Sequence, residues 1–200
     1  MINNQRGFSL YELVAVLTII GIGLSMALPV ISSQILRRNN EALYFQLKTA
    51  VKFAQSEAIR TNTAITICAA QFDTDSGGNH SYLSNNACTN TSWAEGVLTY
   101  VDLNANGSYD SGERVRALRF DYTATITGAD SNGTGITRFL FESNGQISTA
   151  NTPFTFTITQ SKFGTTYTRN VCLNSYGYVC IKNEGDTSAC SSSGDSTCNE

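Results

Sequence analysis

Histidine and closely spaced cysteines are scarce in this sequence. His80 is the single histidine among the 200 residues, and none of the six cysteines belongs to a Cys-x2-Cys pair. Structural zinc sites draw their ligands from such pairs and from histidine. The sequence also lacks a set of nucleophile, base and orienting group, and it lacks a phosphate-binding loop. We therefore expect neither a zinc site nor an enzyme activity, and we expect the side chain of His80 to be solvated.

Charge is also sparse, and it is unevenly divided along the chain. Residues 1–62 carry six Lys or Arg and three Asp or Glu, a net charge of +3. Residues 63–200 carry seven and thirteen, a net charge of −6. An excess of acidic side chains works against tight, non-specific binding of phosphate backbones. Nucleic acid is therefore not an expected partner of this part of the chain.

From Leu13 to Leu36 the sequence has no charged residue over 24 positions. Such a run is long enough to cross a bilayer as a helix. A cleavable secretory signal is the alternative, but no polar cleavage region follows. Instead the helical spacing of apolar residues continues in one stripe, formed by Leu43, Leu47, Ala50, Val51, Ala54 and Ala58. We predict one helix from about residue 8 to residue 60, with a transmembrane half over 8–36 and an amphipathic half over 37–62.

Glu12 and Pro29 are unusual in a simple membrane anchor. A carboxylate at the edge of an apolar span is costly to bury, so Glu12 is a functional candidate unless it sits at the headgroup level. Pro29 removes one intrahelical hydrogen bond and loosens the turn before it.

The residues around Glu12 resemble a known signature. The run Gly7-Phe8-Ser9-Leu10-Tyr11-Glu12 before the apolar stretch resembles the type IV prepilin signature. The resemblance implies that residues 1–7 are a leader, that a prepilin peptidase cuts between Gly7 and Phe8, and that the Phe8 amine is methylated. It also implies that Pro29 loosens the helix and that Glu12 pairs with the Phe8 amine of an adjacent subunit. Such pairing offsets a desolvation cost of several kcal/mol per ion.

The same resemblance implies a location and partners. The chain would begin as a single-pass precursor in the inner membrane and would then join a pilus at the cell surface. Its partners would be major and minor pilins, contacted through the N-terminal helix. The globular domain, residues 63–200, would be periplasmic or extracellular.

After Asn62 the periodicity changes from helical to alternating, with turn-forming Gly, Asn and Asp between the segments. A long helix followed by consecutive strands implies an α+β fold, in which the helix stripe packs on an antiparallel sheet. The strands are predicted over residues 64–70, 96–102, 114–121, 138–141, 154–159, 167–173 and 178–182.

Further motifs resemble minor pilins and pseudopilins of the FimT, FimU and GspH type. They are Ala54-x-Ser56-Glu57-Ala58-Ile59-Arg60-x-Asn62, Trp93-x-x-Gly96, Asp102-x-Asn104-x-Asn106-Gly107-x-x-Asp110-x-Gly112-Glu113 and Phe139-x-Phe141-x-x-x-Gly145. The resemblance extends to about Cys180 and does not include the tail from Thr187. It implies the pilin fold and the role of a minor type IV pilin that helps to initiate or cap a pilus, in adhesion or twitching motility.

Two alternative functions share this resemblance. A type II secretion pseudopilin has the same fold and processing. The other alternative is a DNA-binding pilin of natural transformation, which carries a C-terminal Gly-Arg-x-Arg motif. This chain has Gly177-Tyr178-Val179-Cys180 there, so both arginines are missing. Tyr176 and Tyr178 could stack on bases, but we interpret them as hairpin packing.

The cysteines are even in number and lie in a polar domain, which indicates disulfides formed in an oxidising compartment. Cys68 and Cys88 bracket a loop of nineteen residues, whose closure adds on the order of 3 kcal/mol. Cys172 and Cys180 could cross-link a hairpin centred on Tyr176. The pairing among the last four cysteines stays open: Cys172, Cys180, Cys190 and Cys198.

Residues 102–113 also match the ligand pattern of a calcium-binding EF-hand loop. The acceptors and the turn glycine stand at the required positions, and the candidate ligands are Asp102, Asn104, Asn106, Ser108, Asp110 and Glu113. The flanks, however, are predicted strands and not helices. The alternative is a tight strand connection in which Asp caps backbone amides. Calcium is thus a possible cofactor, and no other is expected.

Two aromatic residues carry specific expectations. Trp93 is expected in the core. Phe45 falls nearly opposite the apolar helix stripe. It is expected either to pack on a neighbouring subunit or to lie over the edge of the sheet.

Overall fold

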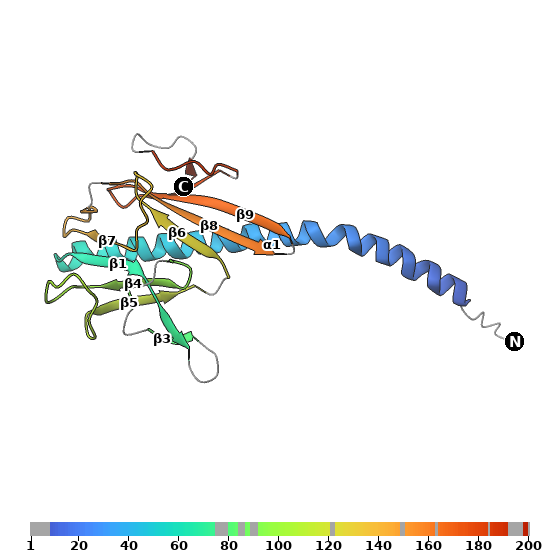
Figure 1. The fold of residues 1–200 in the computed structure, drawn as a ribbon, viewed down its shortest axis with the longest axis horizontal. Coiled ribbons are helices and arrows are strands. Elements are labelled where there is room, and N and C mark those ends of the chain that lie inside the picture. Colours follow the sequence, from blue (N-terminus) through green and yellow to red (C-terminus); the bar gives the residue numbers. More distant parts are fainter. Residues whose placement is uncertain are drawn as a thin grey trace, which may run out of the picture.

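The computed structural model describes residues 9–74, 80–83, 87–88, 92–120, 123–148, 151–162, 164–183, 185–191 and 198–199. Of residues 26–30, 32, 74, 80–82 and 198–199 it describes the backbone only. The predicted cleavage site between Gly7 and Phe8 therefore lies outside the described residues, as do the side chains of Pro29, His80 and Cys198. A long helix projects from a β-rich body, and its N-terminal half extends away from that body (Figure 1).

The helix α1 spans Leu10–Thr61. It begins at the N-cap residue Ser9 and ends at Asn62, whose φ of 52° is left-handed, a common way to end a helix. One turn before its end, Arg60 donates hydrogen bonds to Glu57, and this contact lowers the pKa of Glu57. The helix follows the predicted range of 8 to 60 and continues through Pro29 without a break.

The strands form two main antiparallel sheets, where one was predicted. The first has the order β5-β4-β1-β7: Arg114–Arg119, Gly96–Tyr100, Ile65–Ala69 and Arg138–Phe141. The second has the order β11-β10-β9-β8-β6: Cys198–Asn199, Val179–Lys182, Thr165–Leu173, Phe154–Lys162 and Thr125–Ala129. A separate hairpin pairs β2 (Phe72–Thr74) with β3 (His80–Leu83).

The chain passes between the two sheets more than once, because β6 belongs to the second sheet, β7 to the first and β8 again to the second. β7 ends one sheet against β1, and β8 pairs with β6 and β9 in the other. The fold class is α+β, as predicted, and the seven predicted strands are present. The sequence pattern missed β2, β3, β6 and β11.

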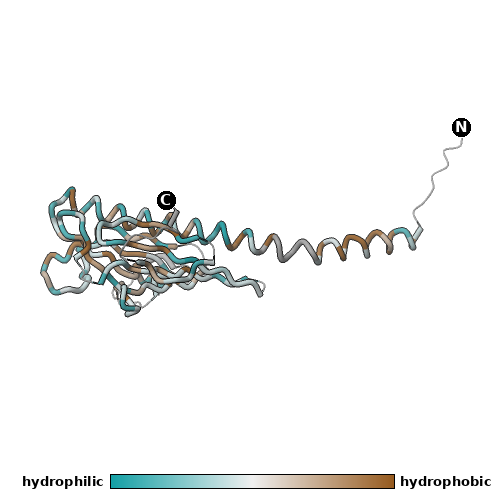
Figure 2. Tube along the Cα trace, turned by 90° about the horizontal axis from the view of Figure 1, so that it is seen from above, coloured by the Kyte–Doolittle hydropathy of each residue, from teal (hydrophilic) through white to brown (hydrophobic). Residues whose placement is uncertain are grey.

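Both sheets pack on the same side of α1, and their apolar faces enclose one core. All six residues of the predicted helix stripe are buried: Leu43, Leu47, Ala50, Val51, Ala54 and Ala58. Trp93 is fully buried, as expected, and its Nε1 donates to the Ile136 carbonyl at 2.8 Å. The hydropathy of the chain shows this change along α1, from a projecting apolar half to a mixed half against the body (Figure 2).

Within the described part of the chain, no helical stretch combines the length and the apolarity that crossing a membrane requires. The predicted span over 8–36 includes positions whose residue or side chain lies outside that description, namely 8, 26–30 and 32.

Candidate assembly face on the long helix

Glu12 and Ser9 form the first structural unit of the exposed helix. The Ser9 amide donates to Glu12 Oε2 at 3.1 Å, and the Tyr11 amide donates to Ser9 Oγ at 3.3 Å. This is a capping box, which satisfies backbone donors that a helix start leaves free. Glu12 is exposed and has no cationic partner among the described residues. Its carboxylate therefore has a local role in the isolated chain and is open to a second partner.

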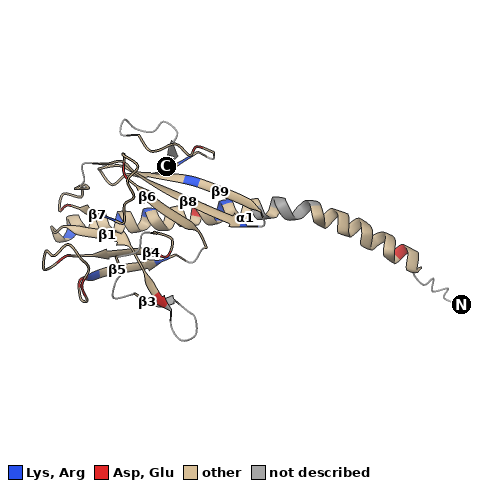
Figure 3. Ribbon diagram, viewed as in Figure 1, with Lys and Arg blue, Asp and Glu red and all other residues tan. Residues whose placement is uncertain are grey.

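The helix beyond Glu12 presents apolar side chains to solvent. Ten large ones between Leu10 and Leu24 are exposed by 49% to 81%. Figure 3 shows this projecting half as uncharged apart from one acidic position near its start. Soluble monomers rarely expose a continuous apolar surface of this extent, so such a surface marks an interaction site. The structure thus divides α1 into an exposed apolar half and a half that packs in the domain.

Gln55 fastens the packed half of α1 to the body. Its Nε2 donates to the carbonyls of Gly145 at 2.9 Å and of Tyr176 at 2.7 Å. These carbonyls belong to two separate turns, after β7 and between β9 and β10. Gln55 was not predicted from the sequence, because a polar residue beside an apolar helix stripe carries no pattern that distinguishes it from a solvated one.

Phe45 is 59% exposed. It lines an open groove between the outer face of α1 and Arg116 on β5. This position beside the edge strand β5 leaves both expectations for Phe45 open. The proposed contact with a neighbouring subunit stays a prediction.

The disulfides differ in part from the expectation. Cys68 is bonded to Cys88, as predicted, with a Cα–Cα distance of 5.5 Å. Cys172 is bonded to Cys190 and not to Cys180. Cys180 is the cross-strand partner of Cys172, and it is itself disulfide-bonded. The hairpin cross-link was therefore wrong, because the tail folds back over β9 and brings Cys190 to Cys172.

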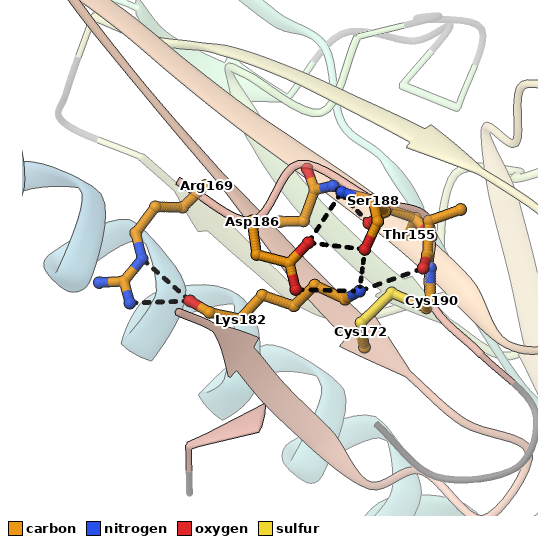
Figure 4. Close-up of polar contacts among 9 residues, drawn as sticks. Thr155, Arg169, Cys172, Lys182, Asp186, Ser188 and Cys190 are labelled. Carbon is orange, nitrogen blue, oxygen red and sulfur yellow. Dashed lines mark hydrogen bonds and ion pairs between the residues drawn. A yellow bond between two sulfur atoms is a disulfide. The ribbon is translucent and has the colours of Figure 1, made fainter. Parts of the chain in front are cut away.

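A buried lysine binds the C-terminal tail, residues 185–191, to the second sheet (Figure 4). Lys182 is 1% exposed, and its Nζ donates to Ser188 Oγ at 2.8 Å and to the Ala189 carbonyl at 3.1 Å. Asp186 Oδ2 lies 3.6 Å from the same Nζ and balances its charge. The Cys190 amide donates to Thr155 Oγ1 at 3.0 Å. The tail is thus anchored to the second sheet by polar contacts that the sequence did not reveal.

In the loop from Asp102 to Glu113, side-chain carboxylates accept hydrogen bonds from backbone amides of the same loop. Asp102 accepts the amides of Asn106 and Gly107 at 3.1 and 2.7 Å. Buried Glu113 accepts the amides of Leu103 and Asp110 at 2.9 and 2.8 Å. These contacts agree with the tight strand connection that was the alternative to a calcium loop.

The other candidate calcium ligands are arranged in the same way. The side-chain oxygens of Asn104 and Asn106 accept the amides of Asn106 and Ser108. Their amide nitrogens therefore point to Asp110 Oδ2, at 2.8 and 2.6 Å. Nitrogen in this form cannot ligate calcium, which takes oxygen ligands. Over the described residues, no group of three or more His, Cys, Asp or Glu side chains is placed to hold a metal ion.

The turn that corresponds to the DNA-binding motif is packed against the helix. Gly177 is buried beside Gln55, and Val179 and Cys180 are buried in the body. An arginine at position 180 would replace a disulfide-bonded core residue. Tyr176 and Tyr178 are 67% and 40% exposed, so neither ring belongs to the core, and their role in hairpin packing stays a prediction.

The comparisons with known proteins agree with this architecture. A family model described as Type II transport protein GspH matches residues 46–177, and a model of the prokaryotic N-terminal methylation motif matches residues 2–28. The pilin-like protein PilA1 of Thermus thermophilus is 35% identical over 116 residues, which cover 58% of this chain. The chain spans 60% of the length of that relative.

A solved structure shares the fold. The crystal structure of the type IV minor pilin FimU of Pseudomonas aeruginosa matches with a TM-score of 0.51 at 21% identity, over 74% of this chain and 92% of FimU. The GspH model covers about two thirds of the 200 residues, and the projecting helix carries the methylation motif. The chain therefore belongs to the GspH family and is a type IV minor pilin-like protein.

Proposed function

We propose that this protein is a structural, non-enzymatic subunit of a type IV pilus, which it helps to initiate or cap in surface adhesion or twitching motility. The observation that carries the proposal is the apolar half of α1, which extends from the body with an exposed carboxylate near its start. Such a helix needs another apolar environment, first the bilayer and then the helices of other pilins.

Processing and location belong to the same proposal. A prepilin peptidase cuts between Gly7 and Phe8 and methylates the Phe8 amine, after which residues 8–36 form the membrane span and later the filament core. The domain then lies outside the inner membrane, in the periplasm or at the cell surface. The match to the methylation motif over residues 2–28 and the disulfides support this order of events.

Glu12 changes partner during assembly in this proposal. In the isolated chain its carboxylate caps the helix through the Ser9 amide at 3.1 Å. In the filament it pairs with the Phe8 amine of an adjacent subunit. In an apolar surrounding an unpaired carboxylate costs several kcal/mol, so the ion pair favours the assembled state and sets the register between subunits.

Two substitutions separate the charge of Glu12 from its capping role. Glu12→Gln keeps an oxygen that accepts the Ser9 amide but removes the charge, whereas Glu12→Ala removes both. We expect both variants to reach the membrane with their disulfides formed and to enter sheared filaments at least about tenfold less than the wild type, because an ion pair is lost. Normal incorporation of the Gln variant would show that the charge has no role in assembly.

A type II secretion pseudopilin is the second candidate, because the matching family model carries the description of a type II transport protein. The two functions differ in the filament that contains the protein. Immunolabelling of surface pili supports the first function. Co-purification with a secretion apparatus, together with loss of protein secretion on deletion, would support the second.

A further inference from the structure

Four asparagines of the domain begin the acceptor pattern for N-linked glycosylation, Asn-x-Ser or Asn-x-Thr, in which x is not proline. They are Asn79, Asn90, Asn106 and Asn132. The pattern is short and the domain is rich in Asn, Ser and Thr, so matches also arise by chance. The surroundings of each side chain therefore decide which asparagine an enzyme can reach. Asn79 and Asn90 lie outside the described residues.

The side chain of Asn106 is held inside its own loop. Its Oδ1 accepts the Ser108 amide at 2.7 Å, and its Nδ2 donates to Asp110 Oδ2 at 2.6 Å. An acceptor asparagine must present Nδ2 to a sugar and release one of its hydrogens. Both amide atoms of Asn106 are engaged, so this residue stabilises the turn and is a poor acceptor.

Asn132 has the opposite arrangement. It lies in the turn of residues 130–134 after β6, where Asn132, Gly133 and Thr134 are all exposed. The side chains of Asn132 and Thr134 make no hydrogen bond with a described residue. A Cβ added to Gly133 would meet no atom within 4 Å, so the space beside the two side chains is open. Both groups of the acceptor pattern, the amide and the hydroxyl, are thus accessible from solvent.

The carboxylate of Asp130 gives this turn its shape. Asp130 is buried, and its Oδ1 accepts the amides of Asn132 and Thr134 at 2.9 and 2.8 Å. Its Oδ2 accepts a hydrogen bond from Asn151 Nδ2 at 3.1 Å. Because Asp130 satisfies these backbone donors, the turn does not need the side chain of Asn132. Figure 1 shows the connection from β6 to β7 on the β-rich body, away from the projecting half of α1.

We propose that Asn132 is an N-glycosylation site whose sugar donor is a glycosyl group on a lipid pyrophosphate. A bond forms between Asn132 Nδ2 and the anomeric carbon of the sugar, while the bond from that carbon to the pyrophosphate oxygen breaks. One Nδ2 proton passes to a base of the transferase, and the lipid pyrophosphate leaves. A donor anchored in the bilayer is within reach of a precursor that is anchored there too. The inference rests on the export of the domain in the proposed function, because acceptors of this type occur on exported proteins.

Peptide mass mapping of the full chain purified from its native host tests the site. Trypsin releases residues 120–138 as one peptide, in which Asn132 is the single asparagine. We expect this peptide to carry the mass of a sugar, and we expect fragmentation to place the sugar on Asn132. The glycan adds its mass to that of the processed chain, so the N-terminal peptide is measured separately in the same digest.

Substitutions in the acceptor pattern separate modification from folding. Thr134→Ala removes the hydroxyl and is expected to abolish the sugar on Asn132, whereas Thr134→Ser keeps a hydroxyl and should retain the sugar. Because the Thr134 side chain makes no hydrogen bond with a described residue, both variants should form the same disulfides as the wild type. Asn106→Gln, in the other Asn-Gly pattern, is the matched control and should leave Asn132 modified.

The outcomes separate the site from the filament function. A processed chain that enters filaments with Asn132 unmodified, or only deamidated, would overturn the site and leave the proposed function intact. A sugar on Asn106 in place of Asn132, or one on Asn132 that persists in Thr134→Ala, would overturn the site as well. A chain that keeps residues 1–7 would instead contradict the proposed function.

Discussion

Individual residues set the position of the helix on the body. Gln55 donates hydrogen bonds to the carbonyls of Gly145 and Tyr176. Two glycines leave the space that the helix needs to come this close to the two turns. Gly145 and Gly177 have φ angles of +79° and +75°. A Cβ on Gly177 would lie 2.5 Å from Gln55 Nε2, and one on Gly145 would lie 2.7 Å from Ile59 Cδ1. Glycine is thus required there both for its backbone angle and for its size.

Gly177→Ala is expected to destabilise the protein through two effects. The left-handed backbone costs about 1–2 kcal/mol for alanine, and the methyl group displaces Gln55. Gly133→Ala is the matched control, because Gly133 has a φ of +80° with open space around it. Guanidinium unfolding of the full chains in detergent should show a free energy of unfolding at least about 1 kcal/mol lower for Gly177→Ala than for the control. Equal losses would mean that the contact with Gln55 does not matter.

At the scale of elements, the tail is the part that depends most on specific contacts. Residues 185–191 have no regular strand, and Lys182, Thr155 and Cys172 of the second sheet hold them. The bond from Cys172 to Cys190 closes a segment that includes β10. The tail is therefore an integral part of the sheet's outer surface.

Disulfide mapping tests the placement of the tail. Alkylation before reduction should find no free thiol, and digestion should yield peptides that join Cys68 to Cys88 and Cys172 to Cys190. A peptide that joins Cys172 to Cys180 would contradict the fold of the tail, because their cross-strand register also brings these two residues together.

The loop between β4 and β5 provides a test at the same scale. Asp102 accepts two backbone amides, so Asp102→Ala should lower the free energy of unfolding by about 1–3 kcal/mol. This loss should be equal in 1 mM calcium and in EDTA, since the described ligands face amides and not a common centre. A melting temperature of the wild type that rises with calcium would show that the loop rearranges around the ion.

Helices and strands could be predicted where apolar residues recur with a regular spacing along the sequence. The six stripe residues of α1 and the strand at 138–141 follow periods of 3.6 and 2, and they were placed correctly. β6 was missed because its Gly128 weakens the strand pattern; the glycine is needed because a Cβ there would lie 2.9 Å from Trp93 Nε1. The capping box of Ser9 and Glu12 could be predicted from the Ser-x-x-Glu spacing. The disulfide between Cys172 and Cys190 could not be predicted from the sequence, because it depends on the long-range contacts of Lys182.

At the scale of the whole molecule, charge and apolar surface are separated. The apolar face lies on the projecting half of α1, and the domain after residue 62 carries a net charge of −6. This arrangement suits a subunit that inserts one end into an apolar core and keeps its domain in water.

The charge of the domain predicts that the protein does not capture DNA. A gel-shift titration of the full chain in detergent at about 0.15 M salt, where charges are screened beyond roughly 8 Å, should show no complex at micromolar protein. Salt-sensitive binding at that concentration would place the protein among DNA-uptake pilins. Replacement of Arg114, Arg116 and Arg119 would then test β5 as the site.

Maturation as a pilin can be measured by the mass of the intact protein from its native host. We expect one mature species that has lost residues 1–7 and carries one methyl group on the amine of Phe8, with all cysteines oxidised. The same protein from a host without its prepilin peptidase should keep residues 1–7. A full-length, unmethylated species in the native host would contradict the account.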